Sequence, residues 1–284
     1  MTIRSFELLQ PRSLKEAVGL LQEHGEDARA LGGGTTLVIL MKQRALHYPY
    51  LVDLQSVAGL GDIKNEADGV RIGALVTHRR VETSPEIQRA FPSLAQAFAC
   101  IGNVRVRQTA TVGGNLAHAD YRLDPPPPLL VLGAEVSIFG PKGARTIALK
   151  DFFCGMYETA LESGELLVDV KIPFAPANSR TVYLRYSTLS ANDWPCLGVA
   201  AYLVKENGRC RDLRVALGGV GPAPLLIDGL TFAEDQILDH AVVSKLLDVV
   251  DQQISPFSDL RGTEWYKRRI ARLFVKRAVE QLND

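Results

Sequence analysis

Two glycine-rich segments, residues 32–36 (GGGTT) and residues 111–115 (TVGGN), constrain this chain more than any other feature. Each follows a short apolar run and carries small hydroxyl or amide side chains. Glycine has no Cβ, so the backbone there can adopt positive φ angles and approach a ligand closely. Successive N–H groups in such turns form a concave anion site that fits a diphosphate. Two such segments, far apart in sequence, predict one extended ligand gripped from both sides.

Neither segment matches a standard nucleotide-binding motif. The first lacks the third glycine of the dinucleotide fingerprint and the Gly-Lys-Ser/Thr of a P-loop. Taken singly, each segment is explained as well by a tight turn between a strand and a helix. The surroundings of the second favour a ligand, because Arg105, Arg107 and Thr109 precede it. Asp124, in a segment stiffened by four prolines, is placed either to hydrogen-bond a ribose hydroxyl or to cap a turn.

Composition excludes several classes of protein. Lys plus Arg and Asp plus Glu both number 32, so no basic excess indicates a nucleic-acid binder. The four cysteines form no CxxC pair, which disfavours a zinc site or an iron–sulfur cluster and favours free thiols in a reducing compartment. The N-terminus lacks a signal-peptide pattern, and no apolar run approaches the roughly 20 residues of a membrane span. The chain is therefore expected to be soluble and cytoplasmic.

No group of residues indicates catalysis by side chains. His118 has no second ligand at metal-binding spacing and is expected to be packed or solvated. Ser187, Ser190 and Asp193 do not resemble a nucleophile elbow. The sequence thus predicts no catalytic residue and no metal site of its own.

The order of elements predicts an α+β protein in three units. Strands at 6–9, 28–31 and 50–54, with helices from Leu14 to near Gly25 and at 37–44, form a β-α-β-α-β unit over residues 1–55. Ser13 begins the first helix with capping-box spacing.

The second unit, residues 56–175, starts with a hairpin at Asp68-Gly69. It continues with helices near 81–90 and from Ser93, which again has capping-box spacing, and with strands at 129–139, 145–149 and 166–172. The third unit, residues 176–284, has strands at 181–187, 197–205 and 211–217, a hairpin turn at Asn207-Gly208, and helices at 241–254 and 264–282.

Five motifs follow one another in an order typical of one family. They are residues 33–37 (GGTTL), residues 111–117 (TVGGNLA), Asp124 with its prolines and residues 129–136 (LLVLGAEV), residues 164–173 (GELLVDVKIP) and residues 218–224 (GGVGPAP). Together they resemble the FAD-binding medium subunits of molybdenum hydroxylases, such as aerobic carbon monoxide dehydrogenase and xanthine dehydrogenase. The resemblance covers nearly the whole chain.

The resemblance implies a two-subdomain α/β FAD-binding domain of the PCMH type, followed by a C-terminal antiparallel sheet with helices. It implies that both glycine segments bind the diphosphate and adjoining parts of FAD, and that Asp124 holds a hydroxyl or other polar group. The residues implied for FAD binding are Gly32, Gly33, Gly34, Thr35, Thr36, Ile101, Thr111, Val112, Gly113, Gly114, Asn115, Asp124, Leu167 and Arg185.

Several positions depart from the family pattern. Gly32 replaces the usual alanine, Tyr121 stands where proline is common, and Arg185 replaces lysine, which changes hydrogen-bond geometry. Ile101 stands where some relatives have an aromatic residue near the flavin ring. The cysteine-bearing insert that gives some relatives an extra iron–sulfur cluster is missing between Leu116 and Val131.

The implied function is electron transfer. Substrate oxidation would occur at a molybdenum cofactor on a large subunit, and [2Fe-2S] clusters on a small subunit would pass electrons to FAD on this chain and on to an external acceptor. A dimer of heterotrimers is the expected assembly, without nucleic acid or a membrane span. Two alternatives stay open, a self-contained flavin oxidoreductase and a non-catalytic nucleotide-binding module.

Overall fold

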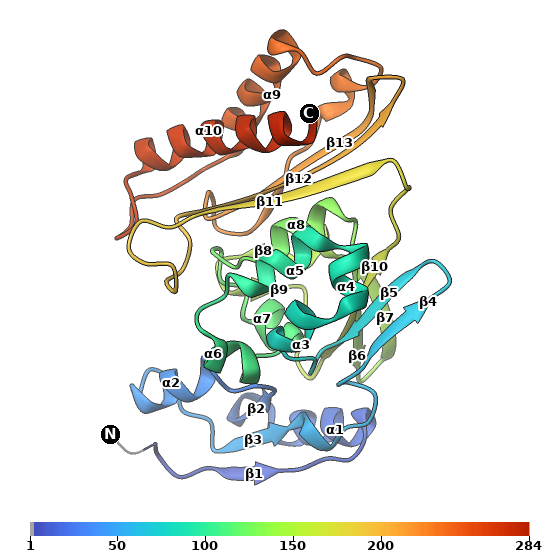
Figure 1. Ribbon diagram of the computed structural model, residues 1–284. Helices are drawn as coiled ribbons and strands as arrows, with labels where there is room; N and C mark the ends of the chain where they lie inside the picture. The colour runs from blue at the N-terminus through green and yellow to red at the C-terminus, as the bar shows by residue number, and fades with distance from the viewer. Residues whose placement is uncertain (1–2, 284) are drawn as a thin grey trace.

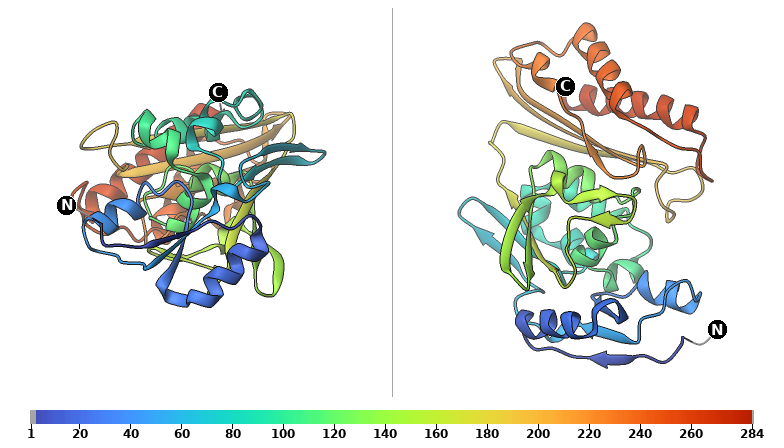
Figure 2. Two further views of the ribbon diagram at one scale, coloured as in Figure 1. Left: turned by 90° about the horizontal axis from the view of Figure 1, so that it is seen from below. Right: turned by 180° about the vertical axis from the view of Figure 1, so that it is seen from behind.

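A computed structural model describes residues 3–283 and arranges them in three layers that follow chain order (Figure 1). The view from behind shows the same sequence of layers, with the N-terminal layer at one end and the C-terminal layer at the other (Figure 2). Residues 1, 2 and 284, the outer ends of the first and third expected units, lie outside the described residues.

The first layer is a three-stranded parallel sheet with the order β1-β3-β2. Its elements are β1 (Glu7–Leu9), α1 (Leu14–His24), η1 (Gly25–Asp27), β2 (Ala28–Leu31), α2 (Leu37–Lys42), β3 (Tyr50–Asp53) and η2 (Leu54–Ser56). Ser13 caps α1 as expected, since its hydroxyl accepts from the Glu16 N–H at 3.1 Å. The apolar face of α1 packs on β3 through Val18 and Leu21.

The second layer is a five-stranded antiparallel sheet with the order β4-β5-β10-β6-β7. Its strands are β4 (Ile63–Glu66), β5 (Gly69–Gly73), β6 (Glu135–Gly140), β7 (Gly143–Ala148) and β10 (Leu166–Pro173), with the small hairpin β8 (Phe153–Gly155) and β9 (Glu158–Thr159). The helices are α3 (His78–Thr83), α4 (Pro85–Ala90), α5 (Pro92–Ala99), α6 (Val104–Thr109), α7 (Val112–His118), α8 (Pro126–Val131) and η3 (Leu149–Asp151).

Three sequence predictions are wrong in this layer, each at a proline. The helix expected near 81–90 is two helices, because Pro85 forces Ser84 into an extended conformation and begins α4. Ser93 does not cap α5, since Pro92 already begins that helix and the Ser93 hydroxyl instead donates to Thr181 Oγ1 at 2.9 Å.

The third error concerns residues 125–139, where a strand was expected to run from residue 129 to residue 139. The chain instead forms α8, followed by β6. The first residues of a helix have no intrahelical partner for their N–H groups, so prolines at 126–128 lose no helical hydrogen bond.

The third layer is an antiparallel sheet with the order β11-β12-β13-β14. Its elements are β11 (Ser179–Tyr186), β12 (Leu197–Glu206), β13 (Arg209–Gly218), β14 (Leu225–Leu226), η4 (Leu230–Ala233), α9 (His240–Gln253) and α10 (Glu264–Asn283). The expected hairpin joins β12 to β13, with φ of 51° at Asn207 and 76° at Gly208.

The central strand β12 is buried on both faces. Val199 and Ala201 pack with α9 and α10, whereas Ala200 and Tyr202 share the core of the second layer with α5 and α8. Figure 1 shows the sheet between these two helix pairs. The C-terminal sheet therefore packs directly on the layer that carries the second glycine segment.

No helix within residues 3–283 is both long enough and apolar enough to cross a bilayer. Over the same residues, no group of three or more His, Cys, Asp or Glu side chains is placed to hold a metal ion.

Candidate functional site

The two glycine segments lie against each other. A Cβ on Gly33 would stand 2.0 Å from the carbonyl oxygen of Thr109, and a Cβ on Gly32 would stand 2.9 Å from Thr111 Oγ1. Helices α2 and α6, which flank the contact, are neighbours in Figures 1 and 2. The two segments therefore contact each other directly in the chain itself, and Gly33 serves first to let these two stretches of backbone meet.

The first segment presents a run of free backbone donors. It is an open loop between β2 and α2, with φ of 67° at Gly34. The N–H groups of residues 33–36 donate to no other group among the described residues. Thr36 also makes no side-chain capping bond to α2. Successive unsatisfied N–H groups in such a loop attract an anion such as a phosphate.

The second segment differs from expectation, because it is the first turn of α7 and its N–H groups are occupied. Thr111 is the N-cap, and the N–H groups of residues 112–115 all donate within the chain. The acceptors are the carbonyl oxygens of Val76, Ala74 and Thr111 and the Thr111 hydroxyl. The prediction that this segment offers free N–H groups is therefore wrong, and Gly113 is explained by contact with Ala74, whose Cβ would lie 2.5 Å from an added methyl group.

What the second segment can offer a ligand is a side chain. Asn115 Oδ1 is buried and has no hydrogen-bond partner in the described part of the chain. The backbone beneath it is held by His78, whose Nε2 donates to the Thr111 carbonyl oxygen at 3.1 Å. Burial lowers the pKa of His78 from 6.5 to about 4, so the ring is neutral and carries its proton on Nε2. An unpaired buried amide oxygen requires a donor from elsewhere.

Asp124 and Arg185, both implied for FAD binding, form an ion pair with each other, and Tyr183 joins them. Asp124 Oδ1 accepts from Arg185 Nε at 2.8 Å and from the Tyr183 hydroxyl at 2.6 Å. Only 4 % of Asp124 is exposed. Burial raises the pKa of Asp124, and the Arg185 charge and both hydrogen bonds oppose that rise.

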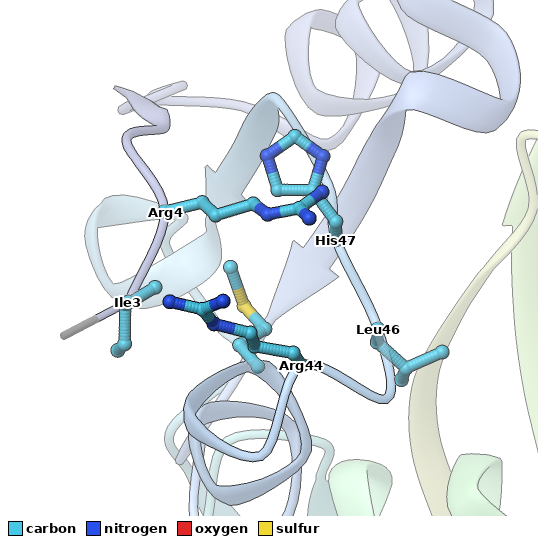
Figure 3. Close-up of a pocket in the computed structure, with 6 residues that line it drawn as sticks. Ile3, Arg4, Arg44, Leu46 and His47 are labelled. Carbon is cyan, nitrogen blue, oxygen red and sulfur yellow. The ribbon is translucent and has the colours of Figure 1, made fainter. Parts of the chain in front are cut away.

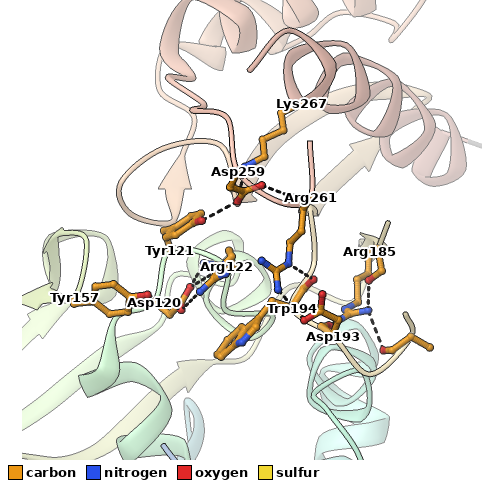
Figure 4. A network of polar contacts seen from close by, with 12 residues as sticks. Asp120, Tyr121, Arg122, Tyr157, Arg185, Asp193, Trp194, Asp259, Arg261 and Lys267 are labelled. Atoms are coloured by element: carbon orange, nitrogen blue, oxygen red, sulfur yellow. Dashed lines mark hydrogen bonds and ion pairs between the residues drawn. The ribbon is translucent and has the colours of Figure 1, made fainter. Parts of the chain in front are cut away.

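Most donors of Arg185 are used within the chain. Besides Asp124, its guanidinium donates to the Ser187 hydroxyl and to the carbonyl oxygens of Ala191 and Asp193. Figure 4 shows the Arg185 guanidinium hydrogen-bonded to the loop that follows β11. Arg185 thus links Asp124 to the 187–193 loop.

Ile101 and Leu167 line the same core. Ile101 is half-buried after α5, and its carbonyl oxygen accepts from Arg107 Nη1 at 3.0 Å. Leu167 is buried in β10, next to a bulge. Arg107 also pairs with Glu82 at 2.9 Å, so it is not free for an anion, whereas Arg105 is exposed.

Tyr121, the residue that replaces the family's usual proline, anchors the chain before Asp124 to the C-terminal layer (Figure 4). Its hydroxyl donates to Asp259 Oδ2 at 2.9 Å, and Lys267 Nζ meets the same oxygen at 2.9 Å. Lys267 is 1 % exposed. Beside it, Arg122 pairs with Asp120 at 2.6 Å. Segment 120–124 is therefore held both by the Tyr121 contact to the C-terminal layer and by the ion pair between Arg122 and Asp120.

Two further features lie apart from the predicted site. His118 packs on the ring of Tyr157 at 5.2 Å, which confirms a packed histidine. Arg4, Arg44 and His47 line a small pocket in the first layer with a volume of about 10 Å³ (Figure 3). It holds none of the predicted site residues and has room for about one water molecule.

Comparisons with known proteins give the same assignment along the whole chain. Residues 4–175 match the model of the FAD binding domain in molybdopterin dehydrogenase, and residues 182–282 match that of the CO dehydrogenase flavoprotein C-terminal domain. The carbon monoxide dehydrogenase medium chain of Afipia carboxidovorans is 32% identical over 278 residues, covering 98% of this chain and 96% of that protein.

Solved structures agree. Carbon monoxide dehydrogenase from Hydrogenophaga pseudoflava contains a chain that superposes with a TM-score of 0.96 at 32% identity, over 99% of this chain and 98% of that one. Quinoline 2-oxidoreductase from Pseudomonas putida 86 contains one with a TM-score of 0.92 at 31% identity, over 100% and 98%. This chain belongs to the family of FAD-binding medium subunits of molybdenum hydroxylases.

Three residues of the flavoprotein's site region escaped the sequence analysis: His78, Tyr183 and Lys267. His78 and Lys267 lie far along the chain from their partners, and no local pattern marks them. Tyr183 had a signal, because it lies two residues before Arg185 and alternate residues of a strand share a face.

Proposed function

We propose that this flavoprotein is the electron-transfer subunit of a molybdenum hydroxylase. It binds FAD and passes electrons from the iron–sulfur clusters of a partner subunit through FAD to an external acceptor. Membership of the family over residues 4–175 and 182–282 carries the proposal. The partners are an iron–sulfur small subunit and a molybdenum-cofactor large subunit, and we propose a dimer of such heterotrimers.

The residues present fit FAD in three respects. The free N–H groups of residues 33–36 suit a diphosphate, and the unpaired Asn115 Oδ1 suits a hydroxyl donor. Asp124 suits a second donor, because a carboxylate accepts but does not donate. Residues 111–114 contact and support the first segment, and Ile101, Leu167 and Arg185 are proposed to lie next to the bound FAD.

FAD, when bound, accepts electrons singly and releases them in pairs, which suits a junction between iron–sulfur clusters and a two-electron acceptor. The chain itself binds, orients and electrostatically surrounds the cofactor. His78 holds the Thr111 end of α7, and the Tyr121–Asp259–Lys267 contacts hold the stretch before Asp124.

We further propose the division of the chain at 55/56 and 175/176. The change from a parallel to an antiparallel sheet supports the first boundary, and the gap between the two matched family models at 175 and 182 supports the second. A cytoplasmic location is supported by the four cysteines, which are free thiols.

Rapid mixing of the purified chain with and without its co-expressed partner subunits tests the function. We expect bound FAD whose visible absorbance bleaches on addition of the complex's substrate only when the iron–sulfur subunit is present. Bleaching by an organic substrate without partners would favour a self-contained oxidoreductase. A chain that binds a nucleotide but shows no reducible chromophore would favour a non-catalytic module.

A further inference from the structure

Tyr183 belongs to the C-terminal sheet, yet its hydroxyl reaches the FAD-binding half of the chain. The side chain is 0% exposed on β11, and its hydroxyl donates to Asp124 Oδ1 at 2.6 Å. The neighbouring strand makes room for it at Gly198, where an added Cβ would lie 2.6 Å from the Tyr183 hydroxyl oxygen. The space left by Gly198 on β12 and the hydrogen bond to Asp124 in the second layer together fix the position of the Tyr183 side chain.

The two donors to Asp124 use the same oxygen. Tyr183 and Arg185 lie two residues apart on β11, so both reach Asp124 from one face of the sheet. All hydrogen bonds and ion pairs of the Asp124 carboxylate within residues 3–283 are made by Oδ1, so Oδ2 accepts none from the described part of the chain. One oxygen of the carboxylate is therefore held, and the other remains for a donor outside the chain.

We infer that Tyr183 is a positioning residue for FAD, which holds the Asp124 carboxylate so that Oδ2 faces a donor group of the cofactor. The inference rests on the proposed function. Because Oδ2 can only accept, the group that it meets is a hydroxyl of the ribityl or ribose chain or a ring N–H, and never a phosphate oxygen.

A purely structural role for Tyr183 gives a different expectation. A buried tyrosine needs a partner for its hydroxyl whatever its function. Tyr183→Phe would then cost folding stability but leave FAD affinity unchanged. Positioning instead predicts that FAD affinity falls and that the fall depends on Asp124.

The experiment is a double-mutant cycle on the full-length chain, with FAD affinity measured by quenching of FAD fluorescence. Tyr183→Phe should weaken FAD binding about tenfold, which corresponds to about 1.4 kcal/mol. In an Asp124→Asn background the same substitution should change affinity less than about twofold, because the coupled partner is already altered. Removal of the phenol also removes a contact that lowers the pKa of Asp124, so the acidic limb of FAD affinity should move to higher pH.

Tyr202→Phe is the matched control. Tyr202 is buried on the same face of the same sheet, but its ring lies against Arg214 at 4.8 Å instead of Asp124. The FAD affinity of the Tyr202→Phe variant should lie within about twofold of that of the unmodified chain. Equal FAD affinity in Tyr183→Phe and the unmodified chain, or an equal loss with and without Asp124, would overturn the inference. If the unmodified chain takes up no FAD either alone or together with its partner subunits, the proposed function itself fails, which distinguishes that failure from failure of the inference about Tyr183.

Discussion

Gly33 offers the sharpest test of how the site is built. The Cβ of an alanine there would lie 2.0 Å from the Thr109 carbonyl oxygen and 2.9 Å from the Ala110 Cα. Ordinary van der Waals contact between heavy atoms begins at about 3.5 Å, so the two glycine segments would have to separate by roughly 1.5 Å. Both obstacles are backbone atoms, which cannot rotate away. Overpacking of this kind costs about 1–3 kcal/mol, and Gly33→Ala should fall at the upper end.

The assay is urea unfolding of the full chain together with FAD titration. The midpoint should fall without a change in slope, and FAD affinity should fall at least about tenfold, because displacing binding groups by about 1 Å is costly. Gly19→Ala is the control, since Gly19 lies in α1 with nothing within 4 Å of an added Cβ. It should raise stability by about 0.5–1 kcal/mol. Near-equal stability of Gly33→Ala and the unmodified chain would refute the close approach.

Three further predictions concern the supports of the site. Lys267→Met leaves Asp259 without its buried partner and should cost about 3 kcal/mol in urea unfolding; an added Asp259→Asn should restore part of this, and no restoration would contradict the ion pair. His78 is neutral when folded, with its pKa lowered from 6.5 to about 4, so the unfolded chain binds the extra proton as pH falls. Stability should drop by up to about 3 kcal/mol between pH 6.5 and 4, and His78→Gln should flatten that slope; parallel pH curves would contradict it. Gly208→Ala, at φ 76° in the exposed hairpin, should cost about 1 kcal/mol without changing FAD affinity, and a loss of FAD binding would contradict the assigned layers.

Local signals in the sequence predicted the fold well where neighbouring residues decide the structure. Ser13 caps α1, Asn207-Gly208 turns the hairpin, and the periodicity of residues 264–282 gives α10. Proline was the main source of error, because its meaning depends on position. Inside a helix it is destabilising, but at 126–128 it begins one.

The sequence predicted which residue types form the site, but it did not predict which residues contact one another. Glycines and hydroxyl side chains in residues 32–36 and 111–115 indicate that the backbone closely approaches another group. Only the fold reveals that Gly33 approaches Thr109 and that the Gly113 N–H donates to the Ala74 carbonyl oxygen. The prolines that follow Asp124 marked it as a candidate site residue in the sequence. Its hydrogen-bond partner Tyr183 lies 59 residues away and carried no such mark. Contacts at such separation depend on the packing of layers, which no local pattern encodes.

The central claim is that the open loop at 33–36 binds the diphosphate of FAD. Parallel titration of the full chain with FAD and with riboflavin, which has no diphosphate, tests it most directly. We predict one FAD per chain and riboflavin binding weaker by at least about 100-fold, equivalent to about 2.7 kcal/mol. Equal affinity for the two flavins would contradict it.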